Sequence, residues 1–337
     1  MNVLVTGAGG FVGGGIARAL IARGHVVHAI QRGSYPALDA LAREGKAKVF
    51  RGDLVDRDGV LRAAEGCGAA FHVAAKAGVW GPYVDYYRSN VVATEHVLAA
   101  CRAHGIGRLI HTSTPSVVHA GHDVTGVDER APYAEKYETA YPETKAIAER
   151  MVLAANGPGL ATIALRPHLV WGPGDPHLVP RLIDRARKGR LMLVGGGKNR
   201  IDATYIDSAV HAHLCAFDRL APGAPVLGKP CAGRAYFIAQ GEPMPLAELV
   251  NGILGAAGVA PVTRSISPRR AWLAGAVLEG AFRLAGAKSE PPLTRFVARQ
   301  LATEHFFDLT AAKRDLGYQA PVTTAEGLER LRLSLRR

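Results

Sequence analysis

The stretch NVLVTGAGGFVGGGIARALIAR, from Asn2 to Arg23, decides the fold. Its first five residues predict a short buried strand, and the apolar spacing after the glycines predicts a helix that runs to about Arg23. Between them the glycines recur every third residue, so the backbone can turn tightly and approach a pyrophosphate at the helix N-terminus. We expect this turn to bind a dinucleotide through Gly7, Gly10, Phe11, Val12 and Gly13.

The alternation of strand and helix continues along the chain. Gly24 and His25 turn the chain into a second apolar strand, Val26–Ile30, which completes a strand–helix–strand unit. The repeated order predicts an α/β fold, a doubly wound parallel sheet of the Rossmann type with helices on both faces. Further strands are expected at 48–51, 69–73, 108–112, 162–165 and 235–238, and helices at 58–64, 86–104, 141–156 and within 205–220.

The pattern breaks up after Pro167, which suggests a second domain. We assign 1–170 and 201–245 to the NADP-binding Rossmann domain. The segments 171–200 and 246–337 form a smaller, mainly helical cap that binds the substrate.

Composition excludes several classes of protein. With 337 residues, of which 48% are hydrophobic, the chain is neither disordered nor fibrous. Its net charge of +12 attracts anions, but the basic residues are scattered and form no nucleic-acid recognition motif. The four cysteines lie far apart in the sequence, which favours reduced thiols that pack in the core over a metal site or a set of disulfides. We therefore expect no metal, and we expect the protein to be cytoplasmic. The apolar stretch 271–287 is too short and too charged to span a bilayer.

The end of the second strand bears on the choice of cofactor. An acidic residue there would accept hydrogen bonds from the adenosine ribose and repel a 2′-phosphate. This chain has Gln31 and Arg32 instead, and Arg32 can pair with the phosphate, so we expect NADP(H). Asp53 and Leu54, after the third strand, are expected to border the adenine.

Tyr141 and Lys145 form a candidate catalytic pair. Residues four apart share one face of a helix, so the ammonium can lie beneath the phenol and lower its pKa toward neutrality. Such a tyrosine can give or take a proton at physiological pH. Hydroxyls at the end of the preceding strand could hydrogen-bond the same substrate oxygen. Spacing alone leaves four candidates open: Thr112, Ser113, Thr114 and Ser116.

These motifs together resemble the extended short-chain dehydrogenase/reductase superfamily over at least the first 240 residues. The detail is most similar to the branch of 3β-hydroxysteroid and sterol C4-decarboxylating dehydrogenases. Within it, the region from Lys76 through Tyr141 looks similar to the 2-alkyl-3-ketoacid reductases of bacterial long-chain olefin biosynthesis. The motifs are TGAGGFVG at 6–13, GDL at 52–54, HVAAKAG at 72–78, NVVATEHVLAAC at 90–101, HTSTPSVV at 111–118, YPETK at 141–145, LRPHLVWGPGD at 165–175 and TYIDSAVHAHLCA at 204–216.

The resemblance implies roles for individual residues. Tyr141 matches the catalytic tyrosine, Lys145 the lysine that holds the nicotinamide ribose, and Thr114 the catalytic hydroxyl, with Ser113 and Ser116 as alternates. Thr114 occupies a position at which many relatives have serine. After the second strand this chain has Gln31 and Arg32, whereas NAD-using relatives have an acidic residue there. The remaining cofactor contacts that it implies are Ala74, Ala75, Lys76, Ser113, Pro167 and the neighbouring His168.

The expected activity is NADPH-dependent reduction of a ketone, with a long-chain 2-alkyl-3-keto acid as substrate. The alternatives are a 3β-hydroxysteroid or sterol dehydrogenase, a nucleotide-sugar epimerase on the same scaffold, and a non-catalytic NADP sensor. The basic segment Arg181–Arg200 could attract an anionic headgroup. The apolar stretch 271–287 could pack on the sheet domain, line a substrate channel or touch a membrane surface. The resemblance further implies a homodimer, and association with other enzymes of the pathway is a further expectation.

Overall fold

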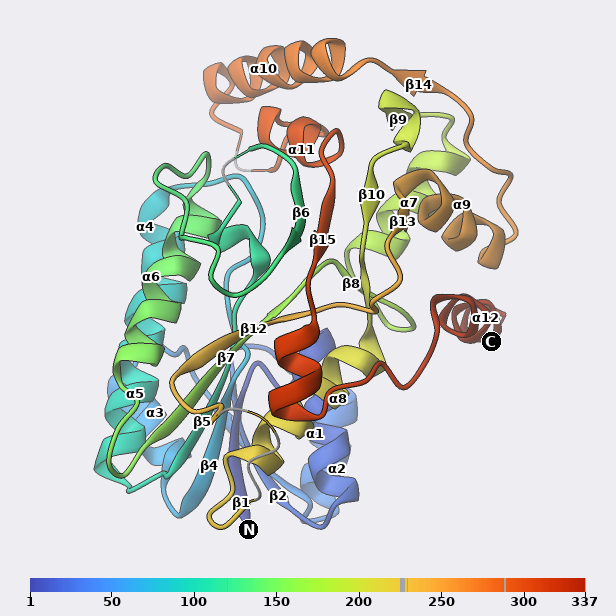
Figure 1. Ribbon diagram of the computed structural model, residues 1–337. Coiled ribbons are helices and arrows are strands. Elements are labelled where there is room, and N and C mark those ends of the chain that lie inside the picture. The colour runs from blue at the N-terminus through green and yellow to red at the C-terminus, as the bar shows by residue number, and fades with distance from the viewer. Residues whose placement is uncertain (120, 225–227, 229, 288, 337) are drawn as a thin grey trace.

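Figure 1 shows a computed structural model of the chain, which describes all residues except 120, 225–227, 229, 288 and 337. Its centre is a seven-stranded sheet in the order β12-β7-β5-β4-β1-β2-β3, in which every neighbouring pair is parallel. This is the predicted doubly wound sheet. The strands are β1 (Asn2–Thr6), β2 (Val26–Gln31), β3 (Ala47–Arg51), β4 (Cys67–His72), β5 (Arg108–Thr112), β7 (Ala161–Pro167) and β12 (Arg234–Ile238).

Helices cover both faces of this sheet (Figure 1). On one face α1 packs against α8, and apolar residues of both helices share a core with the sheet. On the other face α3 packs against α5, and α5 against α6. The helices of this domain are α1 (Phe11–Ala22), α2 (Pro36–Arg43), α3 (Arg57–Ala64), α5 (Ala93–Ala103), α6 (Ala140–Ala154) and α8 (Ile206–Arg219).

The helix expected over 86–104 is interrupted. It is divided into α4 (Tyr83–Tyr86), a π-helical turn η1 (Tyr87–Val92) and α5. A π-helical turn inserts an extra residue and re-aims the side chains within it. Here the turn contains Asn90, which is buried and whose side chain holds the loop after β4. The hydropathy pattern over 86–104 carries no sign of this insertion.

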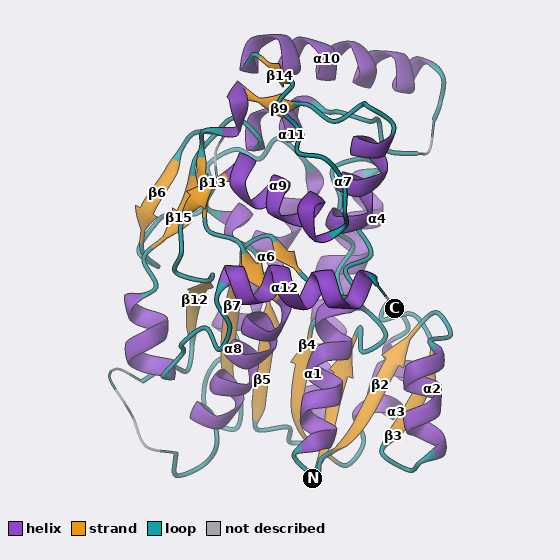
Figure 2. Ribbon diagram, turned by 90° about the vertical axis from the view of Figure 1, so that its right-hand side faces the viewer, coloured by secondary structure: helices purple, strands orange, loops and turns teal. Residues whose placement is uncertain are grey.

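Most of the remaining segments gather above the carboxyl ends of the sheet (Figure 2). A four-stranded sheet in the order β13-β10-β15-β6 lies there, together with α7, α9, α10 and α11. The three glycines Gly195–Gly197 form a short 3₁₀ segment, in which Gly196 has a φ of +74°. The elements are β6 (Val124–Val127), β8 (Val170–Trp171), β9 (Leu193–Val194), β10 (Arg200–Ile201), β11 (Thr204–Tyr205), β13 (Met244–Pro245), β14 (Ser265–Ile266), β15 (His305–Phe307), α7 (Leu178–Arg187), α9 (Leu246–Ala256), α10 (Pro268–Leu284), α11 (Arg295–Gln300), α12 (Thr324–Leu335), η2 (Pro115–Val117), η3 (Gly195–Gly197) and η4 (Ala312–Leu316).

Two contacts cross the predicted domain boundary, and the division into domains stays a prediction. Strand β6 belongs to the segment 1–170, yet it pairs with β15 near the C-terminus. Leu309, Leu316 and Tyr318 are buried in the same apolar cluster as Val5 of β1. The C-terminal segment therefore returns to the Rossmann core after contributing to the upper sheet.

Candidate active site

The glycine turn fits a dinucleotide. Gly7 has a φ of +71°, and a Cβ at Gly13 would lie 2.2 Å from the Gly7 carbonyl oxygen, so α1 can start this close to β1 only with glycine there. Among the described residues no side chain caps the N-terminus of α1, and its first turn has no acidic residue. The Gly10 N–H donates to the Gly7 carbonyl at 2.9 Å, so the N–H groups of Phe11 and Val12 are the ones available to a pyrophosphate.

Arg32 follows β2 and is largely free in solvent. Its side chain is 76% exposed, and its guanidinium lies 3.7 Å from the carboxylate of Asp53. Leu54, the next residue, is buried. An exposed pair of this kind is weak, so Arg32 can turn toward a 2′-phosphate at little cost.

Two residues near Arg32, Tyr35 and Arg51, belong to no motif recognised in the sequence. The ring of Tyr35 lies over Gly9, where a Cβ would come within 2.5 Å of it. Arg51, paired in register with Gln31 across β2 and β3, donates hydrogen bonds to the Gly33 carbonyl and, at 3.3 Å, to the Ser34 hydroxyl. Strand register brings Arg51 to this loop, which linear spacing cannot reveal.

The loop after β4 packs directly on the glycine turn. The Thr6 hydroxyl accepts hydrogen bonds from the N–H groups of Val73 and Ala74, at 3.0 and 3.1 Å. A Cβ at Gly7 would lie 3.0 Å from the Ala74 nitrogen. Ala74 and the exposed Ala75 thus lie at the switch point between β1 and β4, where such sheets bind ligands.

Asn90 ties this loop to the helix of Tyr141. Its amide oxygen accepts from the Lys76 N–H at 2.7 Å, and its amide nitrogen donates to the Lys76 carbonyl at 3.2 Å. The same nitrogen donates to the Thr144 hydroxyl at 3.0 Å, between Tyr141 and Lys145 on α6. Sequence reasoning missed Asn90, although it opens one of the family motifs.

Tyr141, Thr114 and Lys145 come together where α6 begins and β5 ends. The hydroxyl of Thr114 interacts with the Tyr141 phenol. Ser113 instead lies beside the buried carboxylate of Glu149, one turn beyond Lys145. Ser116 accepts a hydrogen bond from the Thr114 hydroxyl at 3.2 Å. This geometry favours Thr114 over its two alternates.

The electrostatics of the pair differ from the sequence expectation. Burial raises the pKa of Tyr141, and the contact with Thr114 only partly opposes this. The Lys145 ammonium donates to the Thr112 carbonyl at 2.7 Å and lies 3.2 Å from His111 Nε2. Burial lowers the pKa of Lys145 to about 8. The expected lowering of the tyrosine pKa by the lysine is therefore not seen in the chain alone, and Tyr141 is held protonated.

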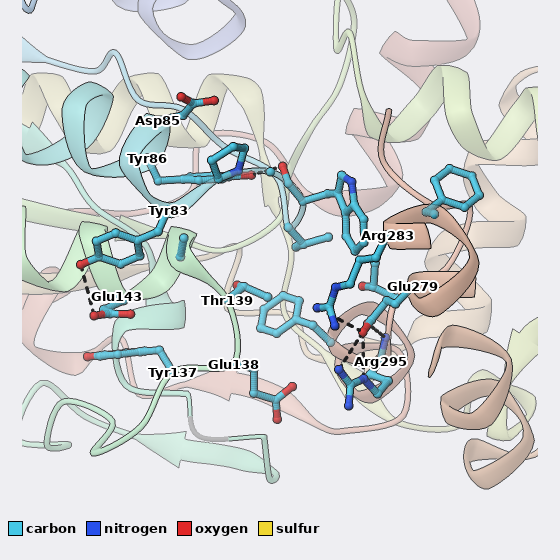
Figure 3. A pocket seen from close by; sticks show the side chains of 18 of the residues that line it. Tyr83, Asp85, Tyr86, Tyr137, Glu138, Thr139, Glu143, Glu279, Arg283 and Arg295 are labelled. Carbon is cyan, nitrogen blue, oxygen red and sulfur yellow. Dashed lines mark hydrogen bonds and ion pairs between the residues drawn. The ribbon is translucent and has the colours of Figure 1, made fainter. Parts of the chain in front are cut away.

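A cavity of about 1200 Å³ adjoins this site (Figure 3). Thr139 and Ala140, immediately before Tyr141, line it together with Lys76 and the segment 79–86. Tyr83 donates a hydrogen bond to Glu143 at 3.2 Å across one wall. The opposite wall comes from the upper helices α10 and α11, through Trp272, Glu279, Phe282, Arg283, Arg295, Phe296 and Arg299.

The structure separates the two features expected to bind substrate. The helix within 271–287 does line the cavity, through one of its faces. The seven basic residues of 181–200 are not among the described residues that line it. The cations at the cavity are Lys76, which pairs with Asp85 at 2.8 Å, and three arginines of α10 and α11. Pro167 is buried at the end of β7, and the backbone N–H of His168 donates to the Ile238 carbonyl on β12.

Other features of the described residues bear on the expected chemistry. No cluster of three or more metal-binding side chains occurs among them. The four cysteines are all free thiols, and three of them are buried. Within the described part of the chain, no helix has the length and apolar character needed to cross a membrane.

Comparisons with known proteins point to one family. The model of the 3-beta hydroxysteroid dehydrogenase/isomerase family matches residues 4–267. The chain is 52% identical over 336 residues to a 2-alkyl-3-oxoalkanoate reductase of Stenotrophomonas maltophilia (strain K279a), covering 99% of both chains. It is 34% identical to a 3 beta-hydroxysteroid dehydrogenase/Delta 5→4-isomerase of Mycobacterium tuberculosis (strain H37Rv), covering 97% of this chain and 88% of that one.

Solved structures agree on the fold. MoeE5 in complex with UDP-glucose and NAD matches with a TM-score of 0.76 and 26% identity, over 100% of this chain and 99% of that one. The structure called gox2253 matches with a TM-score of 0.77 and 27% identity, over 99% and 97% of the two chains. Both neighbours support the Rossmann-type fold, and MoeE5 was solved with NAD bound.

Proposed function

Because this chain belongs to the 3-beta hydroxysteroid dehydrogenase/isomerase family of oxidoreductases, we propose that it reduces the ketone of a long-chain 2-alkyl-3-keto acid to the 3-hydroxy acid. The observation that carries the proposal is the meeting of Tyr141, Thr114 and Lys145 beside a large cavity lined by apolar residues and by charged residues of both signs. The name of the relative at 52% identity supports this substrate class.

The residues perform the proton chemistry of this reduction. A bound NADPH supplies a hydride to the carbonyl carbon. Tyr141 donates its phenolic proton to the carbonyl oxygen, and burial keeps that proton in place until the hydride arrives. Thr114 hydrogen-bonds the same oxygen as negative charge develops on it. Lys145, anchored on the Thr112 carbonyl, is placed to hold the ribose of the nicotinamide.

The cavity suits an alkyl chain that carries an acid group. Trp272, Phe282 and Phe296 give it apolar walls, and each buried methylene contributes roughly 0.8 kcal/mol to binding. Lys76 and Arg283 are cations within the same cavity that a carboxylate can reach. The relative at 52% identity is named for an oxoalkanoate substrate, which favours the keto acid over an epimerase substrate.

Activity against 3-keto acids of graded chain length tests the substrate. We expect kcat/KM with NADPH to rise steeply with alkyl length and then level off. A 3β-hydroxysteroid with NADP⁺ is the comparison, since a relative at 34% identity is named for that activity. A flat length profile together with efficient steroid oxidation would move the assignment to the steroid branch.

We also propose NADP(H) as the preferred cofactor. Arg32 is exposed and adjacent to the adenosine end of the site, and it supports a preference of at least tenfold, or about 1.4 kcal/mol. Arg32→Asp should reverse this preference without changing the melting temperature. Equal efficiency of the unmodified enzyme with NADH and NADPH would contradict the proposal.

Assembly and location complete the proposal. The superfamily resemblance supports a homodimer, which sedimentation of the purified protein would detect directly. The four free thiols suit the reducing cytoplasm, which fractionation of cells would test. An enzyme that sediments as a monomer at all concentrations would contradict the dimer.

A further inference from the structure

His111, on β5, is fully buried and contacts the ammonium of Lys145. The exposed fraction of His111 is 0%, and its Nε2 lies 3.2 Å from the Lys145 Nζ. The carbonyl of the next residue, Thr112, accepts a hydrogen bond from the same ammonium at 2.7 Å. Two adjacent residues of one strand therefore hold the lysine, one through its side chain and the other through its backbone.

The chemistry of the two groups fixes the direction of this hydrogen bond. An ammonium has three N–H donors and no acceptor, so the Nε2 of His111 accepts and the ring proton is on Nδ1. Burial lowers the pKa of His111 well below its usual value, and the ammonium beside it lowers this pKa further. The ring is therefore neutral, which is the state that can accept a hydrogen bond from Lys145.

The other ring nitrogen of His111, Nδ1, is buried and has no hydrogen-bond partner among the described residues. His72, its neighbour in register on β4, cannot supply one, because the hydroxyls of Thr6 and Thr94 lie 2.9 Å from its own two ring nitrogens. An unpaired N–H in the interior disfavours the folded state. The contact with Lys145 is therefore the feature of this ring that calls for an explanation in terms of function.

We propose that His111 is a positioning residue that orients the ammonium of Lys145 toward the nicotinamide ribose. This inference rests on the proposed role of Lys145 as the ligand of that ribose. His111 and Thr112 take two of the three N–H groups, which leaves the third for a ribose hydroxyl. Glu149, one turn further along α6, is held by Arg166 at 2.5 Å and does not displace these acceptors. Fixing the ammonium before the cofactor arrives reduces the entropy that is lost on binding.

Calorimetric titration with two ligands separates this role from a purely structural one. NADPH contains the nicotinamide ribose, whereas 2′,5′-ADP contains only the adenosine end of the cofactor. At pH 7, His111→Leu should weaken NADPH binding about tenfold and 2′,5′-ADP binding by less than about twofold, because only the ribose contact is disturbed. His111→Gln should restore NADPH affinity to within about threefold, since its amide oxygen can accept from the ammonium. Equal losses for the two ligands, or no rescue by glutamine, would overturn the inference.

A double-mutant cycle tests whether His111 acts through Lys145. Lys145→Met should weaken NADPH binding selectively, and His111→Leu/Lys145→Met should bind NADPH no more weakly than Lys145→Met alone. Additive losses would show that His111 affects the cofactor by another route. A selective loss in Lys145→Met without one in His111→Leu would overturn the inference and leave the proposed role of Lys145 intact. No selective loss in Lys145→Met would refute that role and the inference together.

His28→Leu is the matched control. His28 is also buried, on β2, where its Nδ1 lies 2.9 Å from the Ala63 carbonyl and its Nε2 has no partner among the described residues. This variant should lose about as much melting temperature as His111→Leu, with no selective loss of NADPH affinity. An equal selective loss in His28→Leu would contradict the positioning role. If the unmodified protein binds NADH more tightly than NADPH, titration with NADH and ADP gives the same contrast, so the result does not depend on the proposed cofactor preference or substrate.

Discussion

At the scale of single residues, the site depends on how burial sets protonation. Lys145 is buried and Tyr141 is partly buried, and the surrounding protein disfavours the charged form of each. The phenol therefore keeps its proton, and the ammonium is retained only because the Thr112 carbonyl and, further away, Glu149 favour its charge. Reduction of a ketone needs a protonated Tyr141, because the phenol donates its proton to the carbonyl oxygen.

Replacing the tyrosine tests this role directly. Tyr141→Phe removes the proton donor and leaves the ring, so turnover should fall at least a hundredfold with little change in NADPH affinity. Steady-state kinetics and fluorescence titration with NADPH measure the two quantities. Thr114→Ala should harm turnover more than Ser116→Ala. Near-normal turnover in Tyr141→Phe would refute the proton-donor role.

The buried lysine predicts a pH dependence of stability. Because the pKa of Lys145 falls to about 8 on folding, the unfolded chain binds more protons between pH 8 and about 10.5. The cost of burying the ammonium is thus fully present below pH 8 and is relieved as the pH rises. Lys145→Met should exceed the unmodified protein in stability below pH 8, by on the order of 3 kcal/mol, and this difference should shrink toward pH 10.

Urea unfolding at several pH values measures this difference. Lys188→Met is the control, since its ammonium is on the surface in an exposed pair with Asp184. The control should show a small difference that does not vary with pH. A Lys145→Met difference that stays constant from pH 7 to pH 10 would contradict the buried-charge account.

At the scale of elements, α6 is fixed to the sheet by a buried ion pair. Glu149 on α6 and Arg166 on β7 lie 2.5 Å apart, with side chains exposed to 0% and 3%. Tyr133 donates a further hydrogen bond to Glu149 at 2.7 Å. Burial raises the pKa of Glu149, but the hydrogen bonds from Arg166 outweigh this, and the net pKa is lowered. Both groups are therefore charged at neutral pH.

Breaking this pair should be costly. Glu149→Gln leaves the Arg166 guanidinium buried without its counter-charge, and we expect a loss of about 3–5 kcal/mol in the free energy of unfolding. Chemical denaturation measures it. Glu143→Gln, on the same helix but only partly buried, should cost far less. Similar losses in both variants would mean that the buried pair contributes little.

At the scale of the whole molecule, two contacts join the segments above the carboxyl ends of the sheet to the Rossmann core. Strand β6, which lies within the first 170 residues, pairs with β15. Beyond β15, Leu316 and Tyr318 are buried in the apolar cluster that contains Val5 of β1. We therefore expect a single unfolding transition instead of one for each predicted domain.

Two probes can test this expectation. Far-UV circular dichroism follows all the helices. Tryptophan fluorescence includes the signal of Trp171, which is fully buried in the apolar cluster that it shares with residues of α9. The two thermal transitions should coincide within about 2 °C if unfolding is two-state. Two separate steps would support domains that unfold independently.

Local physical rules in the sequence determined much of this protein. Short apolar runs predicted the seven parallel strands nearly to their ends, because the inner strands are buried on both faces. The glycine spacing predicted the turn before α1, since only glycine allows the contact of Gly13 with the Gly7 carbonyl. The four-residue spacing placed Tyr141 and Lys145 on one side of α6, because a helix repeats every 3.6 residues.

Only the tertiary structure decided what these local elements meet. Thr114 was chosen from four hydroxyls by resemblance, and its contact with Tyr141 depends on how β5 and α6 are packed. The lysine's partners, Thr112 and His111, lie on that same strand. Such contacts join residues more than twenty-five positions apart, and no local periodicity encodes them. The same holds for α10, whose cavity-facing and solvent-facing sides were separated only when α11 packed against it.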